Sequence, residues 1–343
     1  MEIKILDTDF VAISVVENYQ SFIWTDRFAQ YGDFELYAPM GEEWLDNIQI
    51  GYYVSCSDSD RLMIIETVEI TSDTEEGDFI KVSGRSLESI LARRIVWQQT
   101  VVSGNPQACI KKLIDDAIIN PAIADRQISN FIFKESTDEG IIGLSMESQY
   151  TGDNLYDVIA DICTQIYAGF RIRLTEENQF EFELYRGYDM TSEVVFSNEY
   201  GNLITSDYTN DTQEYKNVTL VAGDGEGTAR KTAVVGNAAG LNRKELFTDA
   251  RDLSSNNVAA ATYTKQLQQR GSEKLAEVSI TEGFDGTVEP DIMYQYNLDF
   301  SIGDFVTFRD KYGNTGTPRI NEFTISNDEN NGYYCYPTFT MEE

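Results

Sequence analysis

Residues 155–185 read LYDVIADICTQIYAGFRIRLTEENQFEFELY, and this stretch decides the fold class. Its first half predicts a helix, because apolar residues recur there at helical spacing. These residues are Leu155, Val158, Ile159, Ile162 and Ile166. Gly169 can close that helix in a left-handed conformation. The segments 170–174 and 179–185 flank Glu176-Glu177-Asn178, which predicts a β-hairpin, so the middle of the chain is α+β.

A second helix is expected just before this stretch. Asn105-Pro106 supplies an N-cap and a proline in the first turn, and Asn120-Pro121 supplies a stop. Between them, one helical stripe holds Cys109, Leu113, Ala117 and Ile118. The middle of the chain is therefore expected to hold two separate helices, one that ends at Asn120-Pro121 and one that begins near Leu155.

The first hundred residues predict short strands rather than helices. β-Branched and aromatic residues cluster between Gly, Asp and Ser turns, at residues 10–16, 32–37, 51–56, 62–70 and 79–83. This spacing favours a small barrel or sandwich. A short helix is predicted at the end of this β unit, with one apolar side formed by Leu87, Ile90 and Leu91.

Strand patterns return after residue 198. Segments 218–222 and 232–235 predict strands, residues 257–275 predict a weakly amphipathic helix, and the last sixty residues are again β. The chain is thus expected to be α+β and predominantly β, with a barrel-like unit at each end. The expected units are 1–100, an α+β insertion at 101–197, and 198–343 with a helical insertion near 257–277.

The composition excludes several function classes. With 26 basic and 58 acidic residues the formal charge is −32, so no basic surplus is available to bind nucleic-acid phosphates. Histidine is absent, which removes Ser-His-Asp and Cys-His catalysis and HExxH zinc sites. Apolar residues at 41% and aromatic residues at 12% indicate a folded protein rather than an acidic disordered tail.

The four cysteines predict buried free thiols. Cys56, Cys109, Cys163 and Cys335 form no CxxC pair and lie among apolar neighbours. The N-terminus has no charged segment followed by a long apolar run, so we expect the protein to be made soluble in a cytoplasm.

Two local motifs are candidates for ligand binding, but the residues of both favour a turn. Val221-Ala222-Gly223-Asp224-Gly225-Glu226-Gly227 lacks the glycine spacing of a phosphate loop and carries two carboxylates, so a hairpin tip is expected. Residues 327–332 resemble a calcium loop only faintly, and a hairpin turn is expected there too. Metal binding by acidic loops stays open, at Asp58, Asp60, Asp73, Glu75, Glu76 and Asp78.

No catalytic residue, cofactor or metal ligand is assigned. A glycosidase needs only two carboxylates, so the alternative is a β-rich hydrolase that cleaves carbohydrate or peptidoglycan with paired carboxylates. No pair stands out, and nothing matches a GxSxG or SxxK nucleophile in a suitable context.

Several strings, in order, resemble the tail-hub proteins of long non-contractile-tailed phages, fold relatives of contractile-tail hubs. The most specific is Leu241-Asn242-Arg243-Lys244-Glu245-Leu246-Phe247, followed by Asp249-Ala250-Arg251-Asp252-Leu253. The others are Trp24-Thr25-Asp26-Arg27-Phe28, Gly32-Asp33-Phe34-Glu35-Leu36, Gly84-Arg85-Ser86-Leu87-Glu88, Leu91-Ala92-Arg93-Arg94-Ile95-Val96-Trp97, Tyr215-Lys216-Asn217-Val218, Val221-Ala222-Gly223, Gly303-Asp304 and Pro337-Thr338-Phe339.

The resemblance implies a structural protein of a phage or prophage tail tip rather than an enzyme. Three copies would form a ring of two tube-type β-barrel units each, joining the tail tube or distal tail ring to tip fibres or receptor-binding proteins. Tape measure protein and DNA would pass through without DNA being bound. The chain stops at Glu343, so fibre, lytic or receptor-binding activity is expected on another polypeptide.

Charged residues of the resembling strings are candidate interface anchors, with ion pairs inside one chain as the alternative. They are Arg93, Arg94, Arg243, Glu245, Asp249, Arg251 and Asp252. The acidic surplus suggests a further hypothesis, because carboxylates lining a central channel would repel passing DNA. The alternative is that the surplus lies outside and maintains solubility.

Overall fold

The computed structural model describes residues 1–343 except 42–43, 45–46, 76, 290–292, 330–331 and 342–343. Strands account for 41% of the chain and helices for 20%. The predicted class, predominantly β with an α+β insertion, is confirmed. No helix in the described part is both long and apolar enough to span a bilayer.

The described residues of the N-terminal segment form seven strands, of which five lie close to the predicted positions and two, the first and the third, were not among them. The seven are β1 (Ile3–Leu6), β2 (Ala12–Val16), β3 (Ser21–Arg27), β4 (Asp33–Pro39), β5 (Tyr53–Cys56), β6 (Leu62–Asp73) and β7 (Gly77–Ser86). β2 begins later than expected because Phe10 has a left-handed backbone, φ 63°, in the turn that follows β1. The short helix predicted next is the 3₁₀ helix η1 (Leu87–Arg93), whose buried side includes Leu87, Ile90 and Leu91.

The C-terminal segment adds a second group of strands. Four are long: β14 (Leu203–Asp211), β18 (Thr281–Val288), β21 (Arg319–Asp328) and β22 (Gly332–Thr340). Three short ones form a separate sheet: β13 (Val195–Ser197), β19 (Thr307–Arg309) and β20 (Thr315–Gly316). β21 pairs with β22 up to Asp328 opposite Gly332, which confirms the hairpin predicted there, although residues 330–331 lie outside the described part.

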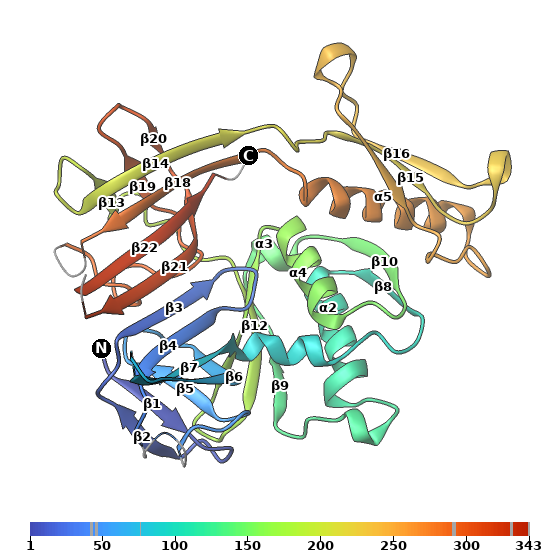
Figure 1. Ribbon diagram of the computed structural model, residues 1–343. Coiled ribbons are helices and arrows are strands. Elements are labelled where there is room, and N and C mark those ends of the chain that lie inside the picture. The colour runs from blue at the N-terminus through green and yellow to red at the C-terminus, as the bar shows by residue number, and fades with distance from the viewer. Residues whose placement is uncertain (42–43, 45–46, 76, 290–292, 330–331, 342–343) are drawn as a thin grey trace.

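The two groups of strands share one sheet of eleven strands. Its order is β14-β18-β22-β21-β3-β4-β7-β6-β5-β1-β2, and Figure 1 shows the blue and red strands side by side. The join is the antiparallel pair β3–β21, in which Trp24 lies opposite Ile325. One hydrophobic core spans both groups, with Trp24 and Phe339 fully buried in it. The domain boundaries 1–100, 101–197 and 198–343 stay a prediction.

The first insertion packs helices against two small sheets and has its own core. Its helices are α2 (Pro106–Ile114), a π turn η2 (Asp115–Ile119), η3 (Ala124–Arg126), α3 (Glu139–Ile142) and α4 (Leu155–Gln165). Its strands are β8 (Thr100–Gly104) paired with β10 (Met146–Tyr150), and β9 (Phe131–Lys134) beside the predicted hairpin of β11 (Gly169–Leu174) and β12 (Phe180–Tyr185).

Helix termini in this insertion test the local predictions. The Asn105 side chain accepts a hydrogen bond from the Ala108 amide, which confirms the predicted N-cap. The prediction for Gly169 is wrong, because Tyr167 takes the left-handed conformation after α4, with φ 51°, and Gly169 begins β11. A Cβ at Gly169 would lie 2.5 Å from the Phe28 ring, so this glycine permits a close approach of β11 to the residue that follows β3.

The second insertion leaves the sheet after β14 and returns at β18. It contains β15 (Val218–Ala222), η4 (Gly227–Ala229), β16 (Thr232–Val235), η5 (Gly240–Asn242), β17 (Glu245–Asp249) and α5 (Ala260–Ala276). The three strands form a sheet in the order β16-β15-β17, and α5 packs on one face of it (Figure 1). Gly225 and Gly227 have positive φ between β15 and β16, which confirms the hairpin tip predicted there.

All four cysteines are buried and free, as predicted. Burial raises the pKa of the Cys56 thiol to about 12 and that of Cys109 to about 11. Neither thiol is therefore reactive at neutral pH.

Candidate assembly surfaces

The eleven-stranded sheet ends in two edges, β2 and β14. Among the described residues, no strand pairs with the outer side of either one. Such an edge offers unpaired N–H and C=O groups to any strand that approaches it. On β2 and the residue before it, Val11, Ile13 and Val15 are 57%, 38% and 47% exposed. We call these three residues the edge row.

The predicted interface residues of the Leu241–Leu253 block lie in the second insertion and pair within the chain. Arg243 Nε lies 2.5 Å from Glu245 Oε1, Asp249 pairs with Arg230, and Arg251 Nε lies 3.7 Å from Asp249 Oδ1. Asp252 accepts from Arg270 at 2.9 Å. The Arg251 and Glu245 side chains nevertheless stay 70% and 66% exposed. Their role between subunits stays a prediction.

Arg93 and Arg94 lie at the end of η1, away from that block. Arg93 is exposed, and Arg94 donates from Nε and Nη2 to the Arg126 carbonyl at 3.1 and 3.0 Å. Burial, with the charges of Arg126 and Arg93, lowers the pKa of Arg94. The nearby Trp97 ring is 57% exposed, with the Arg126 guanidinium 5.2 Å from its centre. Their interface role also stays a prediction.

The second insertion exposes an apolar surface that was not predicted from the sequence. Leu220 on β15 lies opposite Val234 on β16 and Phe247 on β17. Their side chains are 44%, 54% and 57% exposed, whereas Val221 and Ala233 are buried. We call these three residues the insertion face. The sequence holds only a partial signal: apolar residues at successive positions on these strands imply that both sheet faces are apolar, but not which face is covered.

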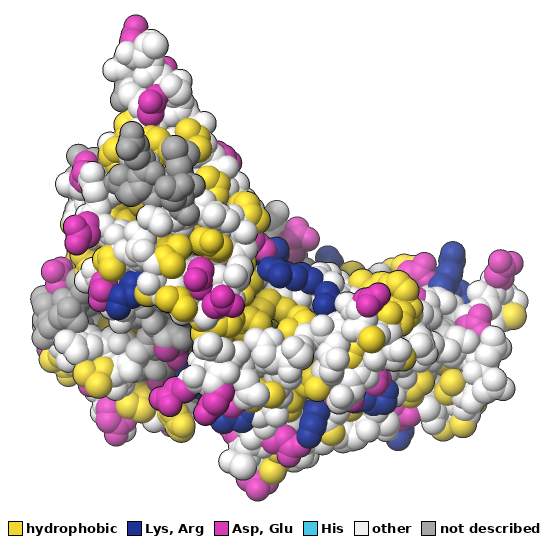
Figure 2. Space-filling model, turned by 90° about the horizontal axis from the view of Figure 1, so that it is seen from below, with side chains coloured by type: hydrophobic (Ala, Val, Ile, Leu, Met, Phe, Trp, Pro, Cys, Tyr) yellow, Lys and Arg dark blue, Asp and Glu magenta, His cyan; other side chains and the backbone are white. Residues whose placement is uncertain are grey.

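The charge of the second insertion differs from that of the rest of the chain. Residues 212–280 hold nine basic and eight acidic residues, although the whole chain carries −32. Figure 2 shows acidic side chains spread widely over the lower face of the molecule, with most Lys and Arg side chains of that face over its middle and right-hand part. The acidic surplus therefore resides outside the second insertion.

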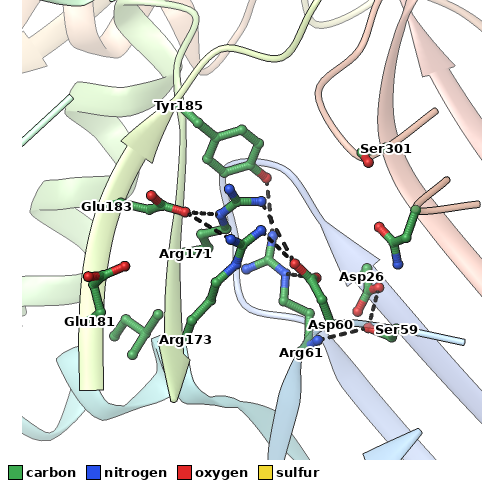
Figure 3. Close-up of polar contacts among 12 residues, drawn as sticks. Asp26, Ser59, Asp60, Arg61, Arg171, Arg173, Glu181, Glu183, Tyr185 and Ser301 are labelled. Carbon is green, nitrogen blue, oxygen red and sulfur yellow. Dashed lines mark hydrogen bonds and ion pairs between the residues drawn. The ribbon is translucent and has the colours of Figure 1, made fainter. Parts of the chain in front are cut away.

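A polar network joins the first insertion to the N-terminal strands (Figure 3). Asp60 accepts from Arg173 Nη2 at 2.6 Å, and Arg171 Nε donates to Glu183 at 2.5 Å. Arg61 pairs with Glu88, and both side chains are almost fully buried. Burial would raise the pKa of Glu183, but the charges of Arg171 and Lys134 outweigh it and lower the pKa. These contacts fix the relative placement of the two regions.

A second part of the network reaches the C-terminal segment. Asp26 is buried, and burial raises the pKa of its carboxyl against the charge of Arg61. It accepts hydrogen bonds from Trp24 Nε1 at 2.9 Å, Ser59 Oγ at 2.7 Å and Tyr296 Oη at 2.9 Å. This carboxyl therefore links β3 to Ser59 and to Tyr296 of the C-terminal segment.

A cavity of about 580 Å³ opens beside this network. Arg171, Arg173 and Arg186 line it together with two carboxylates, Asp138 and Asp304. Asp138 accepts from the Gly140 amide and Asp304 from the Tyr188 amide, each at 2.7 Å. Both carboxylates are thus engaged in fixing loops.

The acidic loops give no metal centre in the described part of the chain. No group of three or more Cys, Asp or Glu side chains converges there. Glu76, one of the six acidic candidates in these loops, lies outside the described residues. Asp60 is instead held by Arg173, and Asp78 accepts from Ser72 Oγ.

Known structures share this architecture over nearly the whole chain. A tail protein from Neisseria meningitidis MC58 superposes with a TM-score of 0.62 at 12% identity, covering 99% of this chain and 96% of that one. The 43 kDa tail protein of prophage MuSo2 from Shewanella oneidensis gives 0.61 at 12% identity, covering 99% and 98%. Prophage tail protein gp18 from Listeria monocytogenes EGD-e gives 0.58 at 11% identity, covering 98% and 94%.

These likenesses establish a shared fold, because sequence identity is low throughout. No curated protein matches the sequence. The family model described as Siphovirus ReqiPepy6 Gp37-like protein matches residues 2–339. The chain therefore belongs to the Siphovirus ReqiPepy6 Gp37-like protein family.

Proposed function

We propose that this protein is the structural hub of a phage or prophage tail tip, with three copies closed into a ring. The observation that carries the proposal is the eleven-stranded sheet with a free edge at each end, β2 and β14. In a ring, strand edges that one copy leaves unpaired can pair with those of the next copy, so fewer edges remain exposed. The fold shared with phage and prophage tail proteins supports this placement.

The hub joins the tail tube or distal tail ring to tip fibres or receptor-binding proteins. Tape measure protein and DNA pass through its centre, and the chain is made in the bacterial cytoplasm before it enters the virion. The charge of −32 suits this role, because an acidic channel wall does not hold DNA by phosphate contacts. The ring is not expected to have enzymatic activity.

Size-exclusion chromatography with light scattering, combined with electron microscopy of the same fractions, tests the proposal. We expect particles of three times 38.8 kDa with a central channel, at a fraction that rises with protein concentration. A chain that stays monomeric and hydrolyses peptidoglycan or another polysaccharide would overturn the proposal in favour of the hydrolase alternative.

A further inference from the structure

The second insertion is a separate body within the chain. It has a core of its own, in which Tyr263 and Leu267 of α5 pack with Val221 of β15. The first insertion has another core, and no described residue belongs to both. Residues 212–217 and 277–280 connect the second insertion to β14 and β18, and Figure 1 shows it projecting to one side of the eleven-stranded sheet. Neither core therefore spans the two insertions.

A second side of α5 meets the first insertion through polar side chains. Gln266, Gln269 and Glu273 recur there at helical spacing, and α5 packs against β10 and α4. Three polar contacts cross between the insertions: Tyr150 Oη donates to Glu273 Oε1 at 3.1 Å, Gln269 Nε2 donates to Gln165 Oε1, and Lys265 Nζ lies 4.0 Å from Glu147 Oε2. We call this region, formed by α5, β10 and α4, the joint.

The joint buries polar side chains that have no hydrogen-bond partner. Gln266 on α5 is fully buried, and Gln149 on β10 is 1% exposed. Gln149 lies on the same side of β10 as Glu147, which contacts α5. Within the described part of the chain, neither Nε2 nor Oε1 of these two glutamines has a partner. A buried donor or acceptor without a partner costs free energy, which hydration recovers when the joint opens.

We propose that the second insertion is a hinged arm, which separates from the first insertion at the joint while both cores stay folded. Opening breaks the few polar contacts of the joint and hydrates Gln149 and Gln266, and no hydrophobic core has to be divided. The connections 212–217 and 277–280 form the hinge. They are joined to each other, because the Lys216 amide donates to the Val278 carbonyl at 3.0 Å. The inference concerns a single chain and does not rest on the proposed ring.

Rising pH favours the open joint. Burial raises the pKa of Glu273 to about 7, against the charge of Arg270. Burial also raises the pKa of Asp161, on α4 and facing α5, to about 6, against the charges of Lys274 and Arg270. Both carboxyls hold their protons more tightly in the closed joint than in water, so opening becomes easier as the pH rises toward 7. The other titratable or charged groups around them are Glu147, Tyr150, Asp153, Asp157, Asp252, Lys265 and Glu277.

Thiol labelling of the full chain tests the arm. Gln266→Cys places a thiol in the joint, and Leu267→Cys is the matched control, because it places one at the next position, inside the core of the second insertion. Both native side chains are at most 1% exposed. Iodoacetamide labels a thiol only when it becomes exposed, and peptide mass spectrometry identifies the position. At pH 8 we expect position 266 to be labelled at least about tenfold faster than position 267, since local opening is more frequent than unfolding.

A native thiol supplies a reference within the same molecule. Cys109 is buried in the core of the first insertion and should stay unlabelled while position 266 reacts. Equal labelling at positions 266 and 267, or at position 266 and Cys109, would overturn the arm, because the joint would then open only when the protein unfolds. If Gln266→Cys does not fold, Gln149→Cys presents a thiol from the other side of the joint and is judged against Cys109 in the same way.

The pH dependence identifies the group that controls opening. Rates are divided by that of glutathione at the same pH, which removes the titration of the thiol itself. From pH 6 to pH 8 the corrected rate at position 266 should rise up to about tenfold, as expected for a carboxyl whose pKa falls from about 7 to about 4.5 on opening. Adding Glu273→Gln should remove most of this rise, whereas adding Glu277→Gln should keep it. A corrected rate that falls toward pH 8, or a rise that survives Glu273→Gln, would overturn the role of Glu273.

Discussion

Arg27 on β3 and Glu322 on β21 form an ion pair with Nε and Oε2 2.5 Å apart, although 295 positions separate them in the chain. They lie opposite each other at the join between the N-terminal and C-terminal strands. Thr25 and Thr324 contact each other beside them at 3.3 Å between hydroxyl oxygens. Because a single sheet and a single core cross this join, we expect the two ends of the chain to unfold together.

A double-mutant cycle measures the coupling free energy of the Arg27–Glu322 ion pair, which connects β3 with β21. Arg27→Ala and Glu322→Ala should each lower the free energy of unfolding by about 1 kcal/mol, with a coupling of about 0.5–1 kcal/mol in urea titrations. The more exposed pair Lys81 and Glu35 is the control, and its coupling should be close to zero. Equal coupling in both cycles would mean that the Arg27 pair has no special role at the join.

Breaking the Arg61–Glu88 ion pair should lower the free energy of unfolding far more than breaking an ion pair on the surface. Both side chains are at most 5% exposed, and Glu88 Oε1 also accepts from the Ile172 amide at 2.9 Å. Glu88→Ala leaves a buried guanidinium without its carboxylate, so we expect a loss of about 3–5 kcal/mol in urea unfolding. The double variant Arg61→Met with Glu88→Leu should be more stable than Glu88→Ala. A loss below about 1 kcal/mol for Glu88→Ala would contradict this role.

Glu273 on α5 makes stability depend on pH. Burial raises the pKa of its carboxyl to about 7, against the charge of Arg270 and the hydrogen bonds from Gln269 and Tyr150. The folded protein therefore holds this proton more tightly than the unfolded chain, and stability falls as pH rises from about 4.5 to about 7. Glu273→Gln cannot titrate, so it should stabilise the protein more at pH 8 than at pH 5.

Urea titrations of the native protein and Glu273→Gln at pH 5 and pH 8 check the direction of this pH dependence. We expect the difference between variant and native protein to grow by up to about 3 kcal/mol toward pH 8. Glu277→Gln, on the exposed end of the same helix, is the control and should show a smaller change. A difference for Glu273→Gln that shrinks toward pH 8 would contradict the raised pKa.

Gly271→Ala in α5 should destabilise the second insertion, although alanine favours a helix. Its Cβ would lie 2.7 Å from Cγ2 of both Val221 and Val235, so α5 would have to move off the sheet. Overpacking of this kind costs about 1–3 kcal/mol, which exceeds the gain of about 1 kcal/mol in helix propensity. Gln268→Ala, exposed on the same helix, should be neutral or slightly stabilising. Thermal unfolding compares the two, and a stabilised Gly271→Ala would contradict the close packing.

Local signals predicted most of the secondary structure. The N-cap at Asn105, the hairpin of β11 and β12 and the helix α5 each depend on residues close together in the sequence. The exception at Gly169 is informative, because the glycine is needed for the approach of Phe28, which is distant in the chain. A local rule could not distinguish that role from a helix cap.

The candidate surfaces were only partly predictable. The sequence singled out Arg243 and Arg251, which the structure places on the rim of the insertion face. It did not indicate Leu220, Val234 and Phe247, because strand patterns alone do not say which face a helix will cover. Likewise, the sequence around Glu88 did not indicate that this carboxylate would be buried against Arg61.

By itself the sequence determined most of the strands and helices, the acidic charge, the absence of imidazole chemistry and the burial of the cysteines. These follow from composition and from periodicities of a few residues. Only the tertiary structure decided that β3 pairs with β21, that the sheet ends at β2 and β14, and that one face of the second insertion stays exposed. Strand partners and covered faces depend on contacts between distant segments, since many pairings satisfy the same local pattern and only packing of the whole chain selects one.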